Sequence, residues 1–327
     1  TFRGFRGFRG SKRVLSVFSV AKMFFPSCAF VLNGFEMTDL DRLLARFDAL
    51  LQRAESLLPP APQAIDWAQT RAARWRHDRQ RGHLEAVARP HRLRLADIRC
   101  VDEQKRELDR NTRQFLAGAP ANNALLWGSR GTGKSSLIKA LLNDHARHGL
   151  RLIEVDRTDL AALPDIVAQL PVRPWRFVVY CDDLSFEAGD ASYKTLKAML
   201  DGSIAAAPEH VLIYATSNRR HLLPERMEDN QQARLIGTEI HHGEGVEERI
   251  SLSERFGLWL SFHPFTQDEY LDIAFHWLRR LGAEIADQEA VRAEALRFAL
   301  TRGSRSGRVA CQFARDWTGR TALARKD

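Results

Sequence analysis

The sequence predicts an α/β fold in which a parallel sheet is sandwiched by helices and is followed by a C-terminal helical lid. Three observations predict it. From about residue 95, short apolar runs alternate with stretches of helical periodicity, as in parallel sheets that helices cover on both faces. A glycine-rich loop lies between the first of these runs and a helical stretch. After residue 265 the strand-like runs end and only helical patterns follow.

Residues 1–36 differ from the rest of the chain. They open with the tandem repeat TFRGFRGFRG, and Lys22 and Pro26 divide the following apolar stretch into pieces too short to span a membrane. Six basic residues and one acidic residue give this segment +5 of the chain's formal charge of +8. We interpret the segment as a leader without a fold, upstream of a start at Met37; a signal or transit peptide is the alternative.

Residues 37–94 are predicted to form an N-terminal helical region. In TDLDRLLARFDALL, Thr38 and Asp41 fit a capping box, and leucines recur at helical spacing up to residue 57. The segment LLPPAPQ is expected to be a linker. Residues 64–94 are rich in arginine and irregular, so we expect a solvated helical lead-in.

The core is predicted at residues 95–264 and the lid at residues 265–327. The expected strands of the core are NALLW, LRLIEVD, RFVVYC, HVLIYATS and LWLSFHPF. In the lid, TQDEYLDIAFHWLRRLG opens with a capping box of Thr266 and Glu269. Two further helices are expected, DQEAVRAEALRFALTRG and SGRVACQFARDW.

The loop GSRGTGKS has the spacing Gly128-x-x-x-x-Gly133-Lys134-Ser135, directly after an expected strand and at the start of an expected helix. This is the context of a phosphate-binding P-loop. Glycines let successive backbone N–H groups face a phosphate, Lys134 is expected to reach the β- and γ-phosphates, and Ser135 is expected to bind Mg²⁺. We therefore expect ATP to bind residues Gly128, Ser129, Arg130, Gly131, Thr132, Gly133, Lys134, Ser135 and Ser136.

The stretch FVVYCDDLSFE ends an apolar strand in carboxylates, which are costly to bury unless they serve a metal, a water or a partner. We expect Asp182, at the strand tip, to hold Mg²⁺ through water. Asp183 is expected to face the γ-phosphate and to polarise the attacking water. Glu187 is the alternative base, if the strand ends in a turn that brings it back.

In order and spacing, these motifs resemble those of the AAA+ ATPases over about residues 95–318. GSRGTGKS matches Walker A, VVYCDD matches Walker B, and LADIRCVDEQKREL resembles the stretch that flanks the adenine. VLIYATSNRR resembles the sensor I strand, LSERFGL the arginine-finger segment and RGSRSGRVACQF sensor II. More narrowly, PANNALLWGSRGTGKSSL and ERFGLWLSFHPFTQDEYL resemble a bacterial AAA+ family of uncharacterised function.

The resemblance implies roles for three further residues. Asn218 is expected beside the γ-phosphate, where its amide orients water. Arg255 is the implied arginine finger, which a neighbouring subunit supplies in this family, so a homo-oligomeric ring or spiral is expected. The alternative for Arg255 is a surface salt bridge. Arg308 is the implied phosphate contact of the lid, with Arg302 and Arg305 as nearby competitors.

The function predicted from these residues is Mg²⁺-dependent hydrolysis of ATP by an oligomeric switch that remodels or loads a protein partner. The alternative is a DNA-associated ATPase of the replication initiator or helicase loader type, which the paired aspartates also resemble. The charge outside residues 1–36 is only +3, and no helix-turn-helix follows residue 318, so nucleic acid is weakly indicated. Residues 152–174 contain no aromatic residue, which argues against a pore loop that threads polypeptides. A poorly hydrolysing scaffold, a kinase and a GTPase fit the motifs less well.

The cysteines and the long insert complete the predictions. No CxxC pair occurs among Cys28, Cys100, Cys181 and Cys311, so we expect reduced thiols in the cytoplasm and no zinc site. We expect no membrane partner. Residues 219–252 form a charged insert, for which we favour a partner-binding or inter-subunit loop over a metal site at His241 and His242.

Overall fold

The computed structural model describes residues 42, 44–50, 53, 64–77, 82–172, 174–186, 191–201, 208–218, 234–236, 239–241 and 252–323. The chain divides into two units, Thr1–Ala61 and Pro62–Asp327. In the first unit, residues 44–50 are helical, as the leucine spacing predicts. The predicted leader and the capping box of Thr38 and Asp41 lie outside the described residues. Within the described ranges, no helix is both long and apolar enough to cross a membrane.

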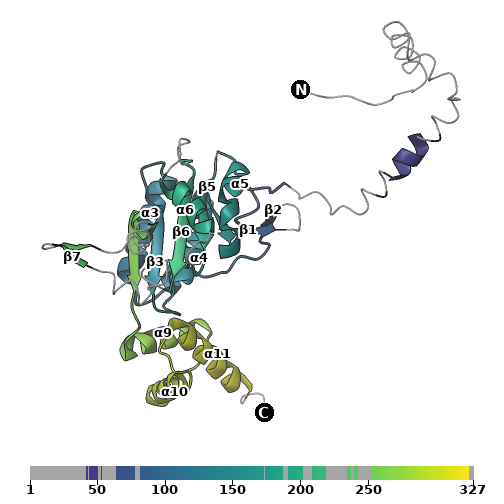
Figure 1. The fold of residues 1–327 in the computed structure, drawn as a ribbon. Coiled ribbons are helices and arrows are strands. Elements are labelled where there is room, and N and C mark those ends of the chain that lie inside the picture. The colour runs from purple at the N-terminus through teal and green to yellow at the C-terminus, as the bar shows by residue number, and fades with distance from the viewer. Residues whose placement is uncertain are drawn as a thin grey trace, which may run out of the picture. The chain divides into compact units, whose positions relative to one another are not determined.

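The second unit is built on a seven-stranded sheet with the strand order β2-β1-β4-β5-β6-β3-β9 (Figure 1). All neighbouring strands are parallel except β1 and β2. The strands are β1 (Ala72–His77), β2 (Gly82–Ala86), β3 (Ala124–Gly128), β4 (Leu150–Val155), β5 (Arg176–Cys181), β6 (Val211–Ser217) and β9 (Leu258–Phe262). The five strands expected from the sequence are therefore confirmed. A separate antiparallel pair, β7 (Arg234–Ile236) and β8 (Glu239–His241), lies in the charged insert.

The prediction of a helical lead-in at residues 64–94 is wrong. This segment supplies the hairpin of β1 and β2, which extends the sheet beside β4. Ala73 and Trp75 are buried, whereas Arg74 between them is half-buried and its Nε donates a hydrogen bond to Glu154 at 2.8 Å. Apolar and charged side chains therefore alternate with the period of two that a half-buried strand requires. The sheet begins upstream of the boundary that the sequence predicted at residue 95.

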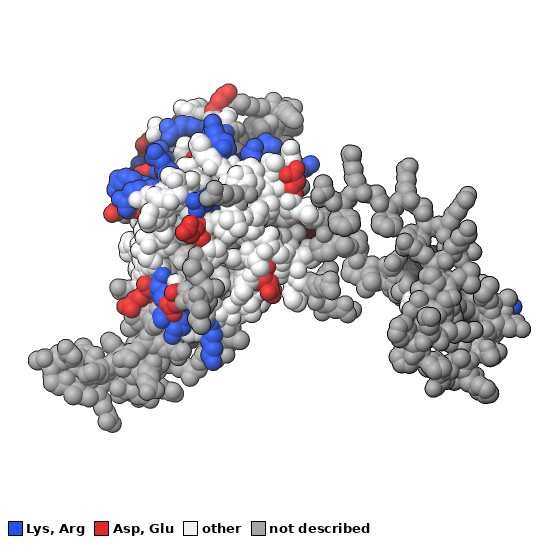
Figure 2. Space-filling view, turned by 90° about the horizontal axis from the view of Figure 1, so that it is seen from above, with Lys and Arg blue, Asp and Glu red and all other residues white. Residues whose placement is uncertain are grey.

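Charged side chains of both signs are interspersed on the face that Figure 2 shows. Lys and Arg lie along the upper border and in a second group at the lower left, with Asp and Glu among them, and much of the remaining described surface is uncharged. Several basic residues are paired with a neighbour, such as Arg76 with Glu85 at 3.0 Å and Arg320 with Asp316 at 2.9 Å. This face therefore presents no broad field of a single sign.

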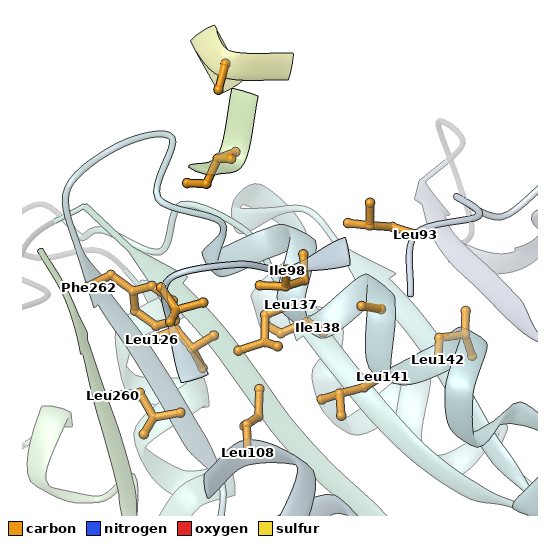
Figure 3. Close-up of a cluster of buried hydrophobic side chains, with 14 of the residues drawn as sticks. Leu93, Ile98, Leu108, Leu126, Leu137, Ile138, Leu141, Leu142, Leu260 and Phe262 are labelled. Atoms are coloured by element: carbon orange, nitrogen blue, oxygen red, sulfur yellow. The ribbon is translucent and has the colours of Figure 1, made fainter. Parts of the chain in front are cut away.

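Helices cover both faces of the sheet. Successive side chains of a strand point to opposite faces, and apolar side chains of the strands are buried on each of them. On one face, Val178 and Tyr180 of β5 pack in a cluster with α3 (Asp102–Leu116) and α4 (Lys134–His145); Figure 3 shows part of it. On the other face, Val179 and Cys181 pack in a second cluster with α5 (Leu163–Ala168) and α6 (Ala191–Asp201). Short 3₁₀ helices lie at η2 (Leu95–Asp97), η3 (Ala146–His148) and η4 (Arg157–Ala162). The predicted α/β fold class is confirmed.

The lid consists of α9 (Gln267–Arg280), α10 (Gln288–Thr301) and α11 (Gly307–Leu323), grouped together in Figure 1. The predicted capping box is present: the backbone N–H of Thr266 donates to Glu269 Oε2 at 2.7 Å, and Glu269 N–H donates to Thr266 Oγ1 at 3.3 Å. The hydroxyl of Tyr270 donates to the carbonyl of Ala295 at 3.0 Å, which joins α9 to α10. All three helices predicted for the lid are confirmed.

The segment around η2 connects the core to the lid through charges. Buried Asp97 forms an ion pair with Arg280 of α9. Arg99 Nε donates to Asp272 Oδ2 of the same helix at 3.2 Å. Both pairs join the segment before α3 to α9, so the first helix of the lid is fixed to the core at two positions along its length.

Candidate nucleotide-binding site

A cavity of about 640 Å³ lies where the glycine-rich loop, the ends of β5 and β6, the segment around η2 and the lid meet. Its volume is in the range of small-molecule sites. Most residues that the sequence nominated line it: Arg130, Gly131, Thr132, Gly133, Lys134, Ser135, Ser136, Asp182, Asp183, Asn218 and Arg308. Gly128 and Ser129 contribute through their carbonyl oxygens, which accept hydrogen bonds from Lys134. Motifs that are far apart in the sequence thus converge on one cavity.

The conformation of the loop requires glycine at two points. Gly128 has φ 125° and Gly131 has φ 75°, both in the region that favours glycine. A Cβ on Gly128 would lie 2.1 Å from the carbonyl oxygen of Phe262, and one on Gly131 would lie 2.8 Å from Cβ of Ser306 at the start of the last lid helix. The loop is therefore enclosed between β9 and the lid, and side chains would not fit there.

Lys134 opens α4 with its side chain buried in the loop. Its Nζ donates to the carbonyl oxygens of Gly128 and Ser129 at 2.7 Å each and to Asn218 Oδ1 at 3.3 Å. Burial lowers the pKa of Lys134 from 10.5 to about 8, although the nearby carboxylates of Asp182 and Asp183 oppose this shift. The ammonium group is thus held by neutral oxygens and is poorly compensated, which suits a site that receives an anion.

Asp182 joins three elements at the carboxyl end of β5. Its Oδ1 accepts hydrogen bonds from Ser135 Oγ of α4 and from Thr216 Oγ1 of β6, both at 2.6 Å. Burial opposes ionisation of Asp182, but the groups around it, with the hydrogen bonds from Ser135 and Thr216 foremost, together lower the pKa. The carboxylate is therefore ionised at neutral pH and faces the hydroxyl that the sequence pairs with it as a metal ligand.

Asp183 and Asn218 form a second pair at this edge of the sheet. Asn218 Nδ2 donates to Asp183 Oδ1 at 2.5 Å, and the N–H of Asp183 donates to Thr216 Oγ1 at 3.0 Å. Asp183 has φ 51°, a left-handed conformation that aspartate tolerates better than most residues. The turn aims its carboxylate toward Asn218 and the cavity. Glu187, the alternative base, lies outside the described residues.

The lid contributes one face of α11. Arg308 lines the cavity as predicted, and Arg315, two turns further along the helix, lines it as well. The competitors Arg302 and Arg305 are absent from the described lining, and the Arg302 guanidinium lies 5.3 Å from the centre of the Phe298 ring. Sequence reasoning missed Arg315, although a spacing of seven residues places it on the same helix face as Arg308.

The other end of the cavity is mainly apolar. Leu93 and Ile98 from the segment around η2 face it, together with Phe265 at the start of the lid and with Ile273 and Trp277 of α9. Such a surface suits a planar base, which buries apolar area against aromatic and aliphatic side chains. The sequence placed the adenine near this segment but did not identify the residues of the lid that complete it.

Arg255 does not line the described cavity of its own chain. Its Nε forms an ion pair with Asp201 at the end of α6. Its side chain is 24% exposed, and that of Asp201 is 40% exposed. The surface salt bridge considered as an alternative is therefore present, and the role of Arg255 as a finger stays a prediction.

Two features of the site fit ATP with Mg²⁺. Ser135 and Asp182 offer a hydroxyl and a carboxylate, the oxygen ligands that Mg²⁺ prefers. The glycine-rich loop leads directly into the N-terminus of α4, and Gly128 and Gly131 leave no room for a side chain there. Backbone N–H groups at a helix N-terminus suit a phosphate group. The oxygen ligands and the phosphate cradle are adjacent, because Ser135 follows Lys134 at the start of the helix.

A glycine-rich loop between β3 and α4, acidic residues after β5, a polar residue after β6 and a helical lid together define a P-loop α/β fold of the AAA+ type. The model of the family described as "Protein of unknown function (DUF815)" matches residues 68–321, and this chain belongs to that family. The matched range includes the hairpin of β1 and β2. No curated protein matches the chain.

The solved structures that are similar to the chain include a RuvB protein and an ORC1 protein. The Holliday junction branch migration motor RuvB of Thermotoga maritima is 17% identical with a TM-score of 0.45, covering 68% of this chain and 63% of that chain. The ORC1 protein of Aeropyrum pernix in complex with DNA is 16% identical with a TM-score of 0.47, covering 65% of this chain and 58% of that chain. The chain thus spans less than two thirds of the length of either structure.

Proposed function

We propose that this protein binds ATP together with Mg²⁺ in the cavity and hydrolyses it. The observation that carries the proposal is the meeting of three groups there: the ammonium of Lys134, the Ser135–Asp182 pair and the Asp183–Asn218 pair. In phosphoryl transfer, such groups serve the phosphate charge, a divalent cation and the attacking water.

The loop and α4 would bind the phosphates. Lys134 would exchange its hydrogen bonds to the carbonyl oxygens of Gly128 and Ser129 for hydrogen bonds to phosphate oxygens. The negative phosphate would then compensate the positive charge of the buried ammonium group. Ser135 and Asp182 would hold Mg²⁺, which when bound neutralises charge on the phosphate oxygens. The base would lie against Ile98 and Trp277.

Asp183 would act as the base. It accepts a proton from water, whose oxygen forms a bond to the γ-phosphorus while the bond between that phosphorus and the β–γ bridging oxygen breaks. ADP departs with the electron pair of the broken bond. Asn218, which already contacts Asp183, orients the water through its amide. Glu187 remains the alternative base.

The arginines that would contact the phosphates come from two places, the lid of the same chain and a neighbouring subunit. Arg308 and Arg315 would bring positive charge to the phosphates from α11. Arg255 lies outside the described cavity of its own chain, which supports a role at the γ-phosphate of a neighbour in a homo-oligomeric ring or spiral. It would exchange Asp201 for the phosphate of the neighbour.

We infer that ATP turnover drives a switch that remodels or loads a protein partner in the cytoplasm. The second candidate is a DNA-associated ATPase of the initiator or loader type, which the aspartate pair after β5 favours. Binding to double-stranded DNA that weakens steeply with added salt would support the second candidate. The interspersed charges in Figure 2 favour the first.

The decisive experiment measures phosphate release from ATP with Mg²⁺ across a range of protein concentrations, for the wild type and Arg255→Ala. A trans-acting finger predicts specific activity that rises with concentration and falls about 10³-fold or more in Arg255→Ala. Arg297→Ala, an exposed lid position, is the matched control. Activity that ignores both concentration and Arg255 would remove the oligomer from the proposal. Absence of turnover at every concentration would count against hydrolysis itself.

A further inference from the structure

Tyr180 has a hydroxyl group without a partner near the proposed metal site. Its side chain is 0% exposed on β5, and none of the described residues forms a hydrogen bond with the hydroxyl. A buried polar group that forms no hydrogen bond lowers stability, and folded proteins contain few of them. Phenylalanine would fill the same space without this cost, so the hydroxyl calls for an explanation other than packing.

The hydroxyl lies beside the Ser135–Asp182 pair. Tyr180 and Asp182 are two residues apart on β5 and therefore share the face that packs against α4. Lys139, one helical turn after Ser135, has its Nζ 5.7 Å from the centre of the Tyr180 ring.

The neighbouring strand provides an internal comparison. Tyr214 of β6 pairs directly with Tyr180 in the sheet register, is equally buried and faces the same side. Its hydroxyl accepts a hydrogen bond from Asn111 Nδ2 at 3.0 Å and lies 3.0 Å from Thr112 Oγ1. The two hydroxyl groups differ in their partners: that of Tyr214 completes a network with α3, whereas that of Tyr180 forms no hydrogen bond with a described residue.

We propose that Tyr180 is a positioning residue for Mg²⁺, whose hydroxyl donates to Asp182 when the metal is bound and so holds the carboxylate in place. The proposal rests on the proposed binding of Mg²⁺ and ATP. Asp182 Oδ1 already accepts from Ser135 and Thr216, so a third donor fixes the carboxylate more fully than two. Groups that orient metal ligands typically change metal affinity or activity about 10- to 100-fold when they are removed.

The test measures binding of a fluorescent ATP analogue (N-methylanthraniloyl-ATP), first in EDTA and then across a series of Mg²⁺ concentrations. Tyr180→Phe removes only the hydroxyl and should melt no lower than the wild type, since no hydrogen bond is lost. In EDTA it should bind the analogue as the wild type does. It should need about tenfold more Mg²⁺ to reach half of the gain in affinity that the metal provides. Tyr214→Phe is the control: it should melt lower but keep the wild-type Mg²⁺ midpoint.

Each contrary outcome has its own meaning. If Tyr180→Phe has the wild-type Mg²⁺ midpoint, Tyr180 does not position the metal ligand and the proposal is overturned. An equal shift of the midpoint in Tyr214→Phe would overturn it too, because general loosening of the sheet would then explain the shift. If the wild type binds the analogue without any effect of Mg²⁺, the proposed function itself fails, and this result is distinct from the other two.

Discussion

The two ends of the cavity differ in how their polar groups are satisfied. At the phosphate end, Lys134, Asp182 and Asp183 each form hydrogen bonds with other groups of the site before any ligand is present. At the lid end, the side chains of Arg308 and Arg315 form no hydrogen bond or ion pair with any other described residue, and the remaining wall is mostly apolar. The phosphate end is preorganised by the sheet, whereas Arg308 and Arg315 of the lid gain polar partners for their side chains only from a ligand.

The strongest test of the preorganised end is Asp183→Asn. Asparagine also tolerates the left-handed conformation at φ 51°, so the turn is retained while the base is lost. We expect kcat for ATP hydrolysis to fall about 10²- to 10⁴-fold with little change in ATP affinity. Glu187→Gln, assayed beside it, should retain activity. The reverse pattern, with Glu187→Gln inactive and Asp183→Asn active, would transfer the role of base to Glu187.

A second test uses the stability of the protein without nucleotide. The pKa of Lys134 is about 8 in the folded chain, below its ordinary value of 10.5, so the unfolded chain holds one more proton between these pH values. The free energy of unfolding should therefore rise between pH 8 and 10.5 by up to about 3 kcal/mol. Below pH 8 the lysine is charged in both the folded and the unfolded chain, so its contribution no longer changes with pH.

Denaturant unfolding at several pH values gives the free energy of unfolding of the wild type and of Lys134→Met. The wild-type value minus the variant value measures the contribution of Lys134. This difference should become more positive as the pH rises from 8 to 10.5 and should not change with pH below 8. MgATP should reduce the pH dependence, because phosphate favours the charged lysine. A difference that does not change with pH would show that Lys134 is not held in a poorly compensated state.

The smallest expected effects are at the lid end. Arg308→Ala and Arg315→Ala should each weaken binding of ATP about tenfold, the size of one charge-assisted hydrogen bond, and should leave the melting temperature of the free protein nearly unchanged. Isothermal titration with MgATP measures the affinity. Arg302→Ala, on the Phe298 ring and away from the described lining, is the matched control. If either variant lowers the melting temperature without nucleotide, the contrast between the two ends is weaker than described.

The same contrast explains what the sequence could predict. The phosphate end comes from short contiguous motifs at strand ends, so its residues could be named before the structure was known. Thr216 was missed, although it lies two residues before Asn218 and so shares its strand face. The apolar end is formed by residues such as Leu93 and Trp277, which are far apart in the chain, and no local sequence pattern shows that they line the same cavity.

The hairpin of β1 and β2 was missed for a different reason. Its arginine content suggested a solvated segment, yet Arg74 lies on the charged side of an alternating strand and Arg151 of β4 is itself buried. The Arg151 guanidinium donates to backbone carbonyl oxygens, including that of Trp67 at 2.8 Å, and lies 3.8 Å from the centre of the Trp175 ring. The number of arginines alone therefore predicted a helix, whereas their alternation with apolar residues indicates a strand.

The hairpin also determines what the outer border of the sheet offers to other molecules. Without it, β4 would be the last strand, and Leu152 and Ile153 would lie on a long open edge whose N–H and C=O groups lack partners. Such an edge recruits strands from other chains and promotes aggregation. With it, the border is the short strand β2, on which Glu85 is exposed and charged. A protein shortened to begin at residue 95 would keep the motifs that line the cavity and lose its protection against self-association.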